Sequence, residues 1–294
     1  MRNTLLPTLT LAVAAAMATG CVPDRPNQPS PQGSEQFAVL AVNTDGYSLD
    51  IVVLNHNGVE LDVIETDVSS DGWAPSLARH PDGFFLVSDG IDLHRVERDG
   101  ASSQFNDEPI WGGTLGVSVS EEGEVTTGNA EDGITKLDPE GEIIVHATMG
   151  GTCFMDTSPL PGDRGRDASI DIYGPRIVAA DSETGALEVL VQGGGGGWQN
   201  ADRLAVDGRG NFFAGSSWQG EVWRIEEGQP ELILDLGTEL GAYQLSALTT
   251  AGPDSVLALI EDSDGSRVIE VDGQGQTTEF AAAELGLWLD IVRY

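Results

Sequence analysis

The fold is decided by residues 75–105, which read PSLARHPDGFFLVSDGIDLHRVERDGASSQF. Four short runs of strand-forming residues follow one another in this stretch: Pro75–Arg79, Phe84–Ser88, Leu93–Glu97 and Ala101–Phe105. Each gap between them is a turn rich in Gly, Asp, Pro or Ser. Short runs bounded by such residues are typical of consecutive antiparallel strands joined by tight turns. We therefore predict one four-stranded sheet in these residues.

A glycine-ending turn between two strand-like runs recurs along the whole chain. The glycines of these turns are Gly46, Gly90, Gly133, Gly185, Gly220 and Gly265. They lie 44, 43, 52, 35 and 45 residues apart. A period in the forties, carried by four-stranded units, indicates the blades of a β-propeller. The sequence thus predicts an all-β, six-bladed β-propeller over residues 37–294.

The two ends of this region are predicted to share one blade. The N-terminal part supplies only three strands, Phe37–Val42, Leu49–Leu54 and Val59–Ile64, while the chain finishes with an extra strand, Leu287–Arg293. If the last strand becomes the inner strand of blade 1, the ring closes and no strand edge is left open.

Blade 4 breaks the regular pattern. Its inner, second and third strands are predicted at Ser169–Ile172, Arg176–Ala180 and Ala186–Val191, and its outer strand is predicted to be degenerate because Gly193–Gly197 packs no side chains. The 19 residues Thr148–Arg166 are predicted to be a long link before this blade. Such a link is either a lid or docking loop, or a neutral insertion.

The N-terminus predicts export. Residues 1–20 have a charged start and an apolar middle, as in a secretory signal peptide. The junction Ala18-Thr19-Gly20-Cys21 resembles a bacterial lipobox, which implies cleavage before Cys21 and a lipid on its thiol. Val22, in place of Asp, resembles lipoproteins sent to the outer membrane of the cell envelope. An ordinary signal peptide or an uncleaved anchor is the alternative. Residues 21–36 contain four prolines and predict an extended tether.

The composition is strongly acidic. Asp and Glu number 48 against 14 basic residues, which gives a net charge of −34 at pH 7. The charge therefore strongly disfavours nucleic acid as a partner and likewise disfavours anionic membrane surfaces, so the lipid on Cys21 is the expected membrane contact. The charge either provides solubility or gathers divalent cations, and the scatter of the acids favours solubility. Cys153 has no partner within the folded part, which predicts a buried apolar side chain.

Four aromatic residues are predicted to surround the mouth of the channel. Trp73, Trp111, Trp198 and Tyr243 each come just before an inner strand, in the links that share a face with the second-to-third turns. They either offer stacking surfaces to a ligand or wedge between neighbouring blades. No His and no Gly-x-Ser-x-Gly motif falls at this mouth, so a Ser/His/Asp hydrolase has little support.

The run Asp202–Phe213, followed by Val222–Ile225, resembles the repeat of six-bladed propellers of the NHL and gluconolactonase (senescence-marker) kind. The hydrolases of that group bind a divalent metal in the channel through Glu, Asn and Asp side chains. The resemblance places Asp202 at the Asp position and Trp73 at the Glu position, with Asn200 close by but out of register. It implies a lactonase or esterase with a rearranged site for calcium or another divalent metal.

Two functions follow as expectations. The first is a monomeric, non-enzymatic lipoprotein without a cofactor, whose propeller mouth binds a small molecule, a glycan or a protein. The second is the metal-dependent lactonase or esterase. The candidate ligand-binding residues are Trp73, Trp111, Trp198, Asn200, Asp202 and Tyr243, and the candidate metal ligand is Asp202.

Overall fold

The computed structural model describes residues 36–43, 46–69, 74–131, 133–162, 166–181, 183–193, 197–242, 244–283 and 287–293. They belong to one compact unit, Ser34–Tyr294. The predicted signal peptide, the lipidation site Cys21 and the tether up to residue 35 lie outside the described residues. Within the described part of the chain, no helix is both long and apolar enough to cross a bilayer.

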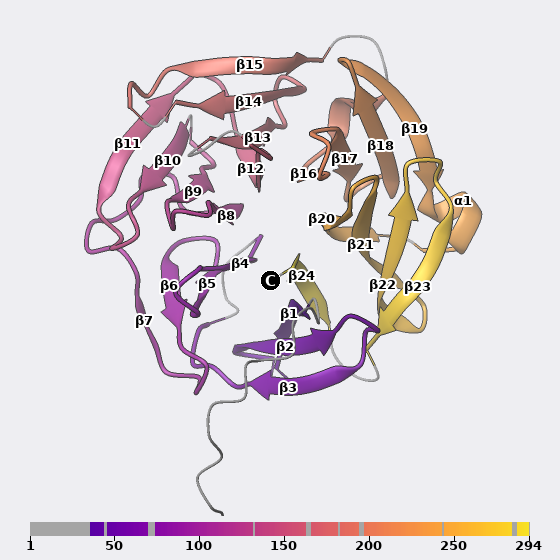
Figure 1. Ribbon diagram of the computed structural model, residues 1–294, viewed down its shortest axis with the longest axis horizontal. Coiled ribbons are helices and arrows are strands. Elements are labelled where there is room, and N and C mark those ends of the chain that lie inside the picture. The colour runs from indigo at the N-terminus through magenta and orange to yellow at the C-terminus, as the bar shows by residue number, and fades with distance from the viewer. Residues whose placement is uncertain are drawn as a thin grey trace, which may run out of the picture. The chain divides into compact units, whose positions relative to one another are not determined.

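Six antiparallel sheets of four strands each form a ring (Figure 1). Blade 1 consists, from the axis outward, of β24 (Trp288–Arg293), β1 (Gln36–Val42), β2 (Leu49–Asn55) and β3 (Glu60–Ile64). Blade 2 consists of β4 (Ser76–Arg79), β5 (Phe85–Ser88), β6 (Leu93–Val96) and β7 (Ser102–Gln104). Blade 3 consists of β8 (Val117–Val119), β9 (Val125–Gly128), β10 (Gly133–Leu137) and β11 (Ile143–Thr148).

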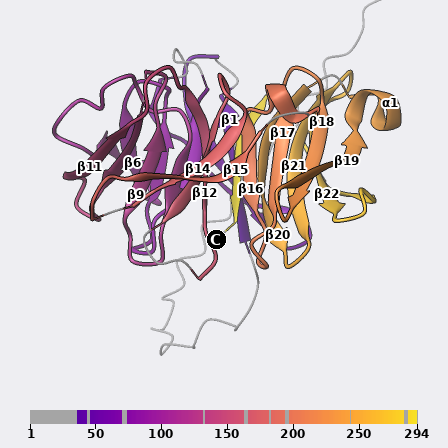
Figure 2. The same ribbon diagram turned by 90° about the horizontal axis from the view of Figure 1, so that it is seen from above.

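The second half of the ring repeats this order. Blade 4 consists of β12 (Phe154–Pro159), β13 (Asp167–Asp171), β14 (Arg176–Ala180) and β15 (Leu187–Gln192). Blade 5 consists of β16 (Arg203–Val206), β17 (Phe212–Ser216), β18 (Glu221–Glu226) and β19 (Gln229–Asp235). Blade 6 consists of β20 (Gln244–Gly252), β21 (Ser255–Asp262), β22 (Gly265–Asp272) and β23 (Thr277–Ala282). The short helices η1 (Trp198–Asn200) and α1 (Leu236–Leu240) precede β16 and follow β19, and α1 lies at the outer edge of the ring (Figure 2).

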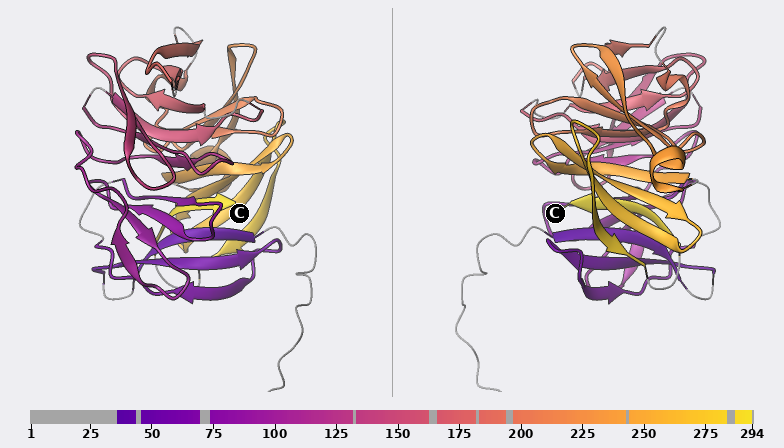
Figure 3. Two further views of the ribbon diagram at one scale, coloured as in Figure 1. Left: turned by 60° about the vertical axis from the view of Figure 1, so that its left-hand side comes forward. Right: turned by 90° about the vertical axis from the view of Figure 1, so that its right-hand side faces the viewer.

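The six-bladed fold and its closure by the two terminal strands are confirmed. β24 pairs antiparallel with β1, from Phe37 opposite Arg293 to Ala41 opposite Trp288. Figure 3 shows the yellow C-terminal strand beside the indigo N-terminal one. The N–H of Val42 also donates to the carbonyl of Leu287 at 2.9 Å. Blade 1 is therefore built from strands at both ends of the described chain, and their pairing closes the ring.

The prediction for blade 4 is wrong by one strand. Its inner strand is β12, Phe154–Pro159, which lies inside the stretch 148–166 that the sequence predicted as a link. The predicted inner, second and third strands are in fact the second, third and outer strands, so the blade is complete. β12 was missed because its polar residues bond to the next blade instead of marking a loop: the N–H of Leu204 donates to Asp156, and the N–H of Val206 donates to Ser158.

The same shift moves one of the six glycine turns. Gly185 lies between β14 and β15, which is a third-to-fourth turn on the other face of the ring. The second-to-third turn of blade 4 is residues 172–175, with Gly174. With Gly174 in place of Gly185, the intervals become 44, 43, 41, 46 and 45 residues. The repeat is therefore regular all the way round.

The core is divided among the contacts between neighbouring blades. Successive side chains of a strand point to opposite faces of its sheet, so Val39 packs against blade 6 while Leu40 packs against blade 2. Six apolar clusters fill the six gaps between blades. The cluster between blades 3 and 4 is the smallest of the six, with only five fully buried members. A further small apolar cluster, which includes Leu115 and Met155, and the buried polar side chains of Lys136 and Asp167 also lie between these two blades.

Candidate functional site

The inner strands enclose a central cavity of about 640 Å³. Every blade contributes to its lining, through β4, β8, β12, β16, β20 and β24. The cavity reaches the last residues of these strands, such as Arg79, Pro159 and Arg293. It therefore lies toward the face that carries the first-to-second turns, which we call the cavity face. A concave site of this size is typical of small-molecule binding.

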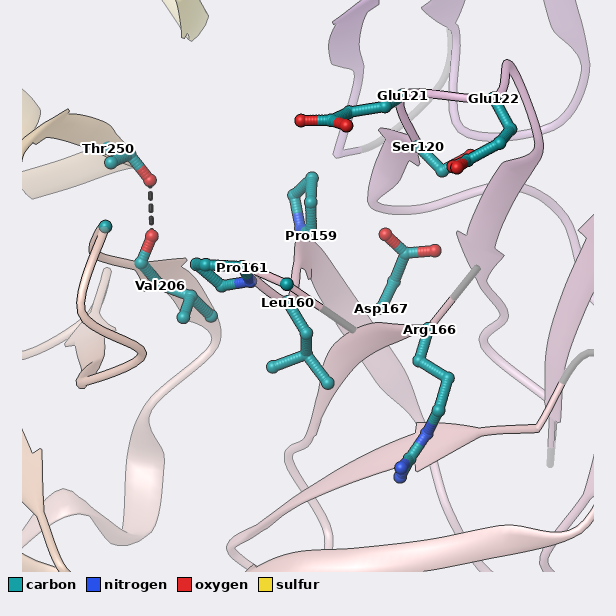
Figure 4. Close-up of a pocket in the computed structure, with 12 residues that line it drawn as sticks. Ser120, Glu121, Glu122, Pro159, Leu160, Pro161, Arg166, Asp167, Val206 and Thr250 are labelled. Atoms are coloured by element: carbon teal, nitrogen blue, oxygen red, sulfur yellow. Dashed lines mark hydrogen bonds between the residues drawn. The ribbon is translucent and has the colours of Figure 1, made fainter. Parts of the chain in front are cut away.

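A second cavity of about 520 Å³ lies beside the first on the cavity face. Glu121, Pro159 and Thr250 line both cavities. Figure 4 shows Glu121 and Glu122 above a wall formed by residues 159–161, and the hydrogen bond of 2.5 Å that Thr250 Oγ1 donates to the carbonyl of Val206. That bond ties β20 to β16 at the rim.

At the opposite end the channel is nearly closed. This end lies toward the face of the blade-to-blade links and second-to-third turns, which we call the link face. The space left there is about 20 Å³. Its polar lining, together with one glycine, forms a ring of one residue per blade: Asp290, Ser76, Gly116, Asp156, Arg203 and Ser246. The sequence predicts ligand binding at the link face, whereas the cavity of about 640 Å³ lies toward the other end of the channel.

Two carboxylates of this polar ring come from opposite blades. Asp156 accepts the N–H of Leu204 at 2.8 Å, and Asp290 accepts the N–H of Leu77 at 2.6 Å. Each acid thereby ties its inner strand to that of the next blade. Both side chains remain partly exposed to the channel. Among the described residues, neither carboxylate has a basic group within salt-bridge distance.

Enclosure by protein changes the acidity of this pair. Burial, and then the charge of Asp290, raise the pKa of Asp156 to about 8. Burial raises the pKa of Asp290 to about 6. Arg203 opposes both shifts, but its guanidinium donates to the carbonyl of Ser246 and to Asp202. Two interacting carboxyl groups with such values share one proton near neutral pH.

The predicted aromatic residues occupy different environments. Trp198 is only 2% exposed and packs in the cluster between blades 4 and 5, so it is a wedge. Trp111 is 71% exposed. Trp73 and Tyr243 lie outside the described residues. Asn200 is exposed at the end of η1.

Asp202, the predicted metal ligand, holds a turn of its own blade. Its carboxylate accepts the N–H of Ser217 at 2.8 Å and the hydroxyl of Ser217 at 2.5 Å, and it lies 3.5 Å from Arg203. A metal at Asp202 would have to displace these contacts. Over the described ranges, no group of three or more His, Cys, Asp or Glu side chains is arranged to hold a metal ion.

Cys153 is buried, as predicted, beside Leu115 and Met155. Burial, and then the charge of Asp171, raise the pKa of its thiol to about 11. A thiol with so high a pKa is almost entirely protonated near neutral pH, which makes it a poor nucleophile. Cys153 is therefore a core residue of the link side of blade 4.

The link face carries a set of five exposed large side chains, of which the sequence had pointed only to Trp111. Four lie in second-to-third turns and one, Trp111, lies in a link. The set is Tyr47, Ile91, Trp111, Tyr173 and Trp218. Trp218 is 87% exposed, the highest value among them. Only the correct placement of blade 4 shows that Tyr173 belongs to this set.

A buried polar network lies between blades 3 and 4. Lys136, the only lysine of the chain, is fully buried. Its Nζ lies 3.8 Å from Glu124 Oε2 and 3.9 Å from Asp167 Oδ2. Thr126 donates a hydrogen bond to Asp167, and burial raises the pKa of Asp167. Asp167 also lines the second cavity.

Comparison with known proteins supports the fold. No family model and no curated protein matches the sequence. Solved structures match over nearly the whole ring. A protein of unknown function from Bacteroides caccae has a TM-score of 0.63 at 11% identity, with 89% of this chain and 99% of that chain covered.

Two further structures show a similar match. A chain of a nidogen/laminin complex has a TM-score of 0.65 at 12% identity, with 89% of this chain and 98% of that chain covered. A streptogramin B lyase has a TM-score of 0.59 at 14% identity, with 87% of this chain and 86% of that chain covered. At such low identity the likeness concerns the fold alone, and the function has to be argued from the site.

Proposed function

We propose that this protein is an exported, lipid-anchored binding protein of the bacterial cell envelope that holds a small ligand in its central cavity. The observation that carries the proposal is the cavity of about 640 Å³ to which all six inner strands contribute. A rigid ring of strands presents a preformed site, which lowers the cost of ordering on binding.

The test blocks the cavity with a bulky side chain. Thr249 is half-buried and lines the cavity, so Thr249→Trp should fill part of it. Thr278→Trp is the matched control, because Thr278 is exposed on the outer strand of the same blade. A chemically mixed ligand library is screened by thermal shift and native mass spectrometry. We expect at least one ligand that binds one-to-one to the control and is lost in Thr249→Trp. A library hit that binds both variants equally would rule out the cavity as the site.

The lipid anchor rests on the junction before Cys21 and is tested separately. Cys21→Ser should leave the propeller folded but move the protein from the membrane fraction to the soluble fraction. Ser and Cys have nearly the same size, so any change comes from the lost thiol. Unchanged membrane association would point to an uncleaved anchor instead.

Exposed aromatic residues favour a second function, protein binding at the link face. Trp and Tyr are enriched at the centres of protein interfaces. The link face exposes Tyr47, Trp111, Tyr173 and Trp218 around the end of the channel, where the described residues enclose a space of about 20 Å³. The net charge of −34 favours a partner with a basic surface. Replacing Trp218 and Tyr173 with Ser should abolish capture of such a partner from envelope extracts. Replacing the exposed Leu61 and Val63 on β3 with Ser is the matched control.

A further inference from the structure

The polar ring at the floor of the central cavity contains two carboxylates and one guanidinium, that of Arg203, which donates to Ser246 and Asp202. Asp156 and Asp290 come from opposite blades. Each carboxylate accepts two backbone N–H groups, one on each oxygen: those of Leu204 and Thr157 at Asp156, and those of Leu77 and Ile291 at Asp290. A carboxylate oxygen has a second lone pair, so each can accept a further hydrogen bond. Carboxylates enclosed by protein are costly unless a positive charge or a proton accompanies them. The described neighbours provide no salt bridge to either one.

Two hydroxyl groups at the same level also lack partners. Ser76 Oγ and Thr157 Oγ1 are buried and form no hydrogen bond within the described structure. Ser76 lines the space of about 20 Å³ at the ring, and Thr157 lines the central cavity next to Asp156. About 10–15 Å³ is enough for one water-sized group. The ring therefore has room for one small polar group with several N–H or O–H bonds to donate.

The opposite end of the cavity carries positively charged side chains. Arg79 and Arg293, the last residues of β4 and β24, line the cavity from adjacent blades. Basic residues are scarce in this chain, with 14 among 294 residues, so two at one rim are a marked local excess. Glu121 is the acidic side chain that lines this part of the cavity. Arginine is well suited to bind a carboxylate with two parallel hydrogen bonds.

We propose that the ligand of the central cavity carries a primary ammonium group, held between Asp156 and Asp290, and a carboxylate, held by Arg79 and Arg293. This inference rests on the proposed function of the cavity. An ammonium group fits the floor because it is about the size of a water molecule and donates three hydrogen bonds. A ligand with an ammonium group at one end and a carboxylate at the other is a free amino acid or a short peptide, and the cavity of about 640 Å³ leaves space for side chains.

Binding of the ammonium group should release a proton. The acid pair shares one proton in the empty site, with Arg203, Arg79, Arg293 and Glu121 as the other charged groups that face the channel. When the ammonium group lies between the carboxylates, the shared proton leaves to solvent and both acids are ionised. Calorimetry in buffers of different ionisation enthalpy measures that proton directly.

The experiment uses the whole propeller domain and a panel of probes. The panel contains the common L-amino acids, di- and tripeptides of alanine and leucine, and their N-acetylated and C-amidated forms, together with neutral and anionic sugars. We expect an amino acid or a peptide to bind. Its N-acetylated form should bind at least tenfold more weakly, and so should its C-amidated form. The length series separates a free amino acid from a peptide.

Matched variants assign the contacts. Asp156→Asn and Asp290→Asn should each weaken the unmodified probe tenfold or more, abolish proton release and leave the N-acetylated form unaffected. Asp107→Asn, at an exposed site, should change nothing. Equal affinity for the unmodified and N-acetylated probes would overturn the inference, and so would binding of only sugars that Thr249→Trp blocks. The latter result leaves the cavity as a binding site, whereas no cavity-dependent binding by any probe rejects the proposed function as well.

Discussion

Asp156 and Asp290 are each the third residue of an inner strand, β12 and β24. These two strands lie on opposite sides of the ring, in blades 4 and 1 (Figure 1). Each carboxylate accepts the N–H of the second residue of the next inner strand, Leu204 in one case and Leu77 in the other. The same interaction therefore occurs twice across the channel. It holds neighbouring blades together and at the same time brings two acids into electrostatic contact.

This pair should make stability depend on pH. The folded pKa values of about 8 for Asp156 and about 6 for Asp290 lie above the ordinary value of 3.8. The folded state therefore binds protons more tightly, and the free energy of unfolding falls as pH rises from about 4 to about 8. Asp156→Asn removes part of this penalty. We expect equal stability of variant and wild type at about pH 3, where Asp156 is protonated in both the folded and the unfolded state, and a variant more stable by roughly 1–3 kcal/mol at pH 9.

Chemical denaturation at a series of pH values measures this difference. Other carboxylates, such as Asp235 and Asp262, have pKa values lowered by hydrogen bonds, so the wild-type curve alone mixes opposite trends. The difference between the wild type and Asp156→Asn isolates the channel pair. Asp107→Asn should give a flat difference. A flat difference for Asp156→Asn as well would mean that the two acids do not interact in the folded protein.

The ring and its closure could be predicted because local sequence determines them. The second-to-third turns require a residue with positive φ, which glycine adopts without steric cost. Four of these turns contain such a glycine: Gly46, Gly90, Gly220 and Gly265. β12 could not be recognised in the same way. Its residues Asp156 and Ser158 are polar because they bond to blade 5, and no local pattern distinguishes such a strand from a loop.

The candidate site was missed for the same reason. Asp156 fell in the predicted link, and Asp290 was read only as part of the closing strand. A signal does exist in the sequence. Both acids follow a large apolar residue within an inner strand, as Met155-Asp156 and Leu289-Asp290. The electrostatic contact between them depends on ring closure, which brings together residues far apart in the chain.

Trp198 and Trp111 hold the same position in the sequence repeat, just before an inner strand. Substitution by Ala should nevertheless change the free energy of unfolding by very different amounts at the two sites. Trp198→Ala removes a side chain that packs between blades 4 and 5, so we expect a loss of about 3–5 kcal/mol in the free energy of unfolding. Trp111→Ala removes an exposed ring and should stay within about 0.5 kcal/mol. Urea denaturation compares the two. Similar losses for both would contradict the buried position of Trp198.

Ring closure should depend on β24. A chain that ends at residue 286 lacks the inner strand of blade 1, which leaves the edge of β1 open and removes Trp288 and Ile291 from the cluster between blades 6 and 1. We expect the truncated protein to lose cooperative unfolding or to associate through the open edge. A synthetic peptide of residues 287–294 should restore the monomer in size-exclusion chromatography. A truncated chain that unfolds like the full one would show that closure contributes little.

Lys136 should be essential for the contact between blades 3 and 4. Lys136→Met keeps the volume but leaves Glu124 and Asp167 without their shared cation, so we expect a loss of about 3–5 kcal/mol. Asp167→Asn in the same chain removes one of the stranded charges. The double variant Lys136→Met/Asp167→Asn should therefore be more stable than Lys136→Met alone, by about 1–3 kcal/mol at pH 7.

The raised pKa of Asp167 also predicts how the stability loss of Lys136→Met changes with pH. Without Lys136, Asp167 should take up a proton as the pH falls, so the deficit of Lys136→Met should shrink toward pH 5 while that of the double variant changes less. Denaturation curves at pH 5 and pH 8 measure both. If the deficit of Lys136→Met is the same at the two pH values, packing of the lysine stem, and not its charge, holds these blades together.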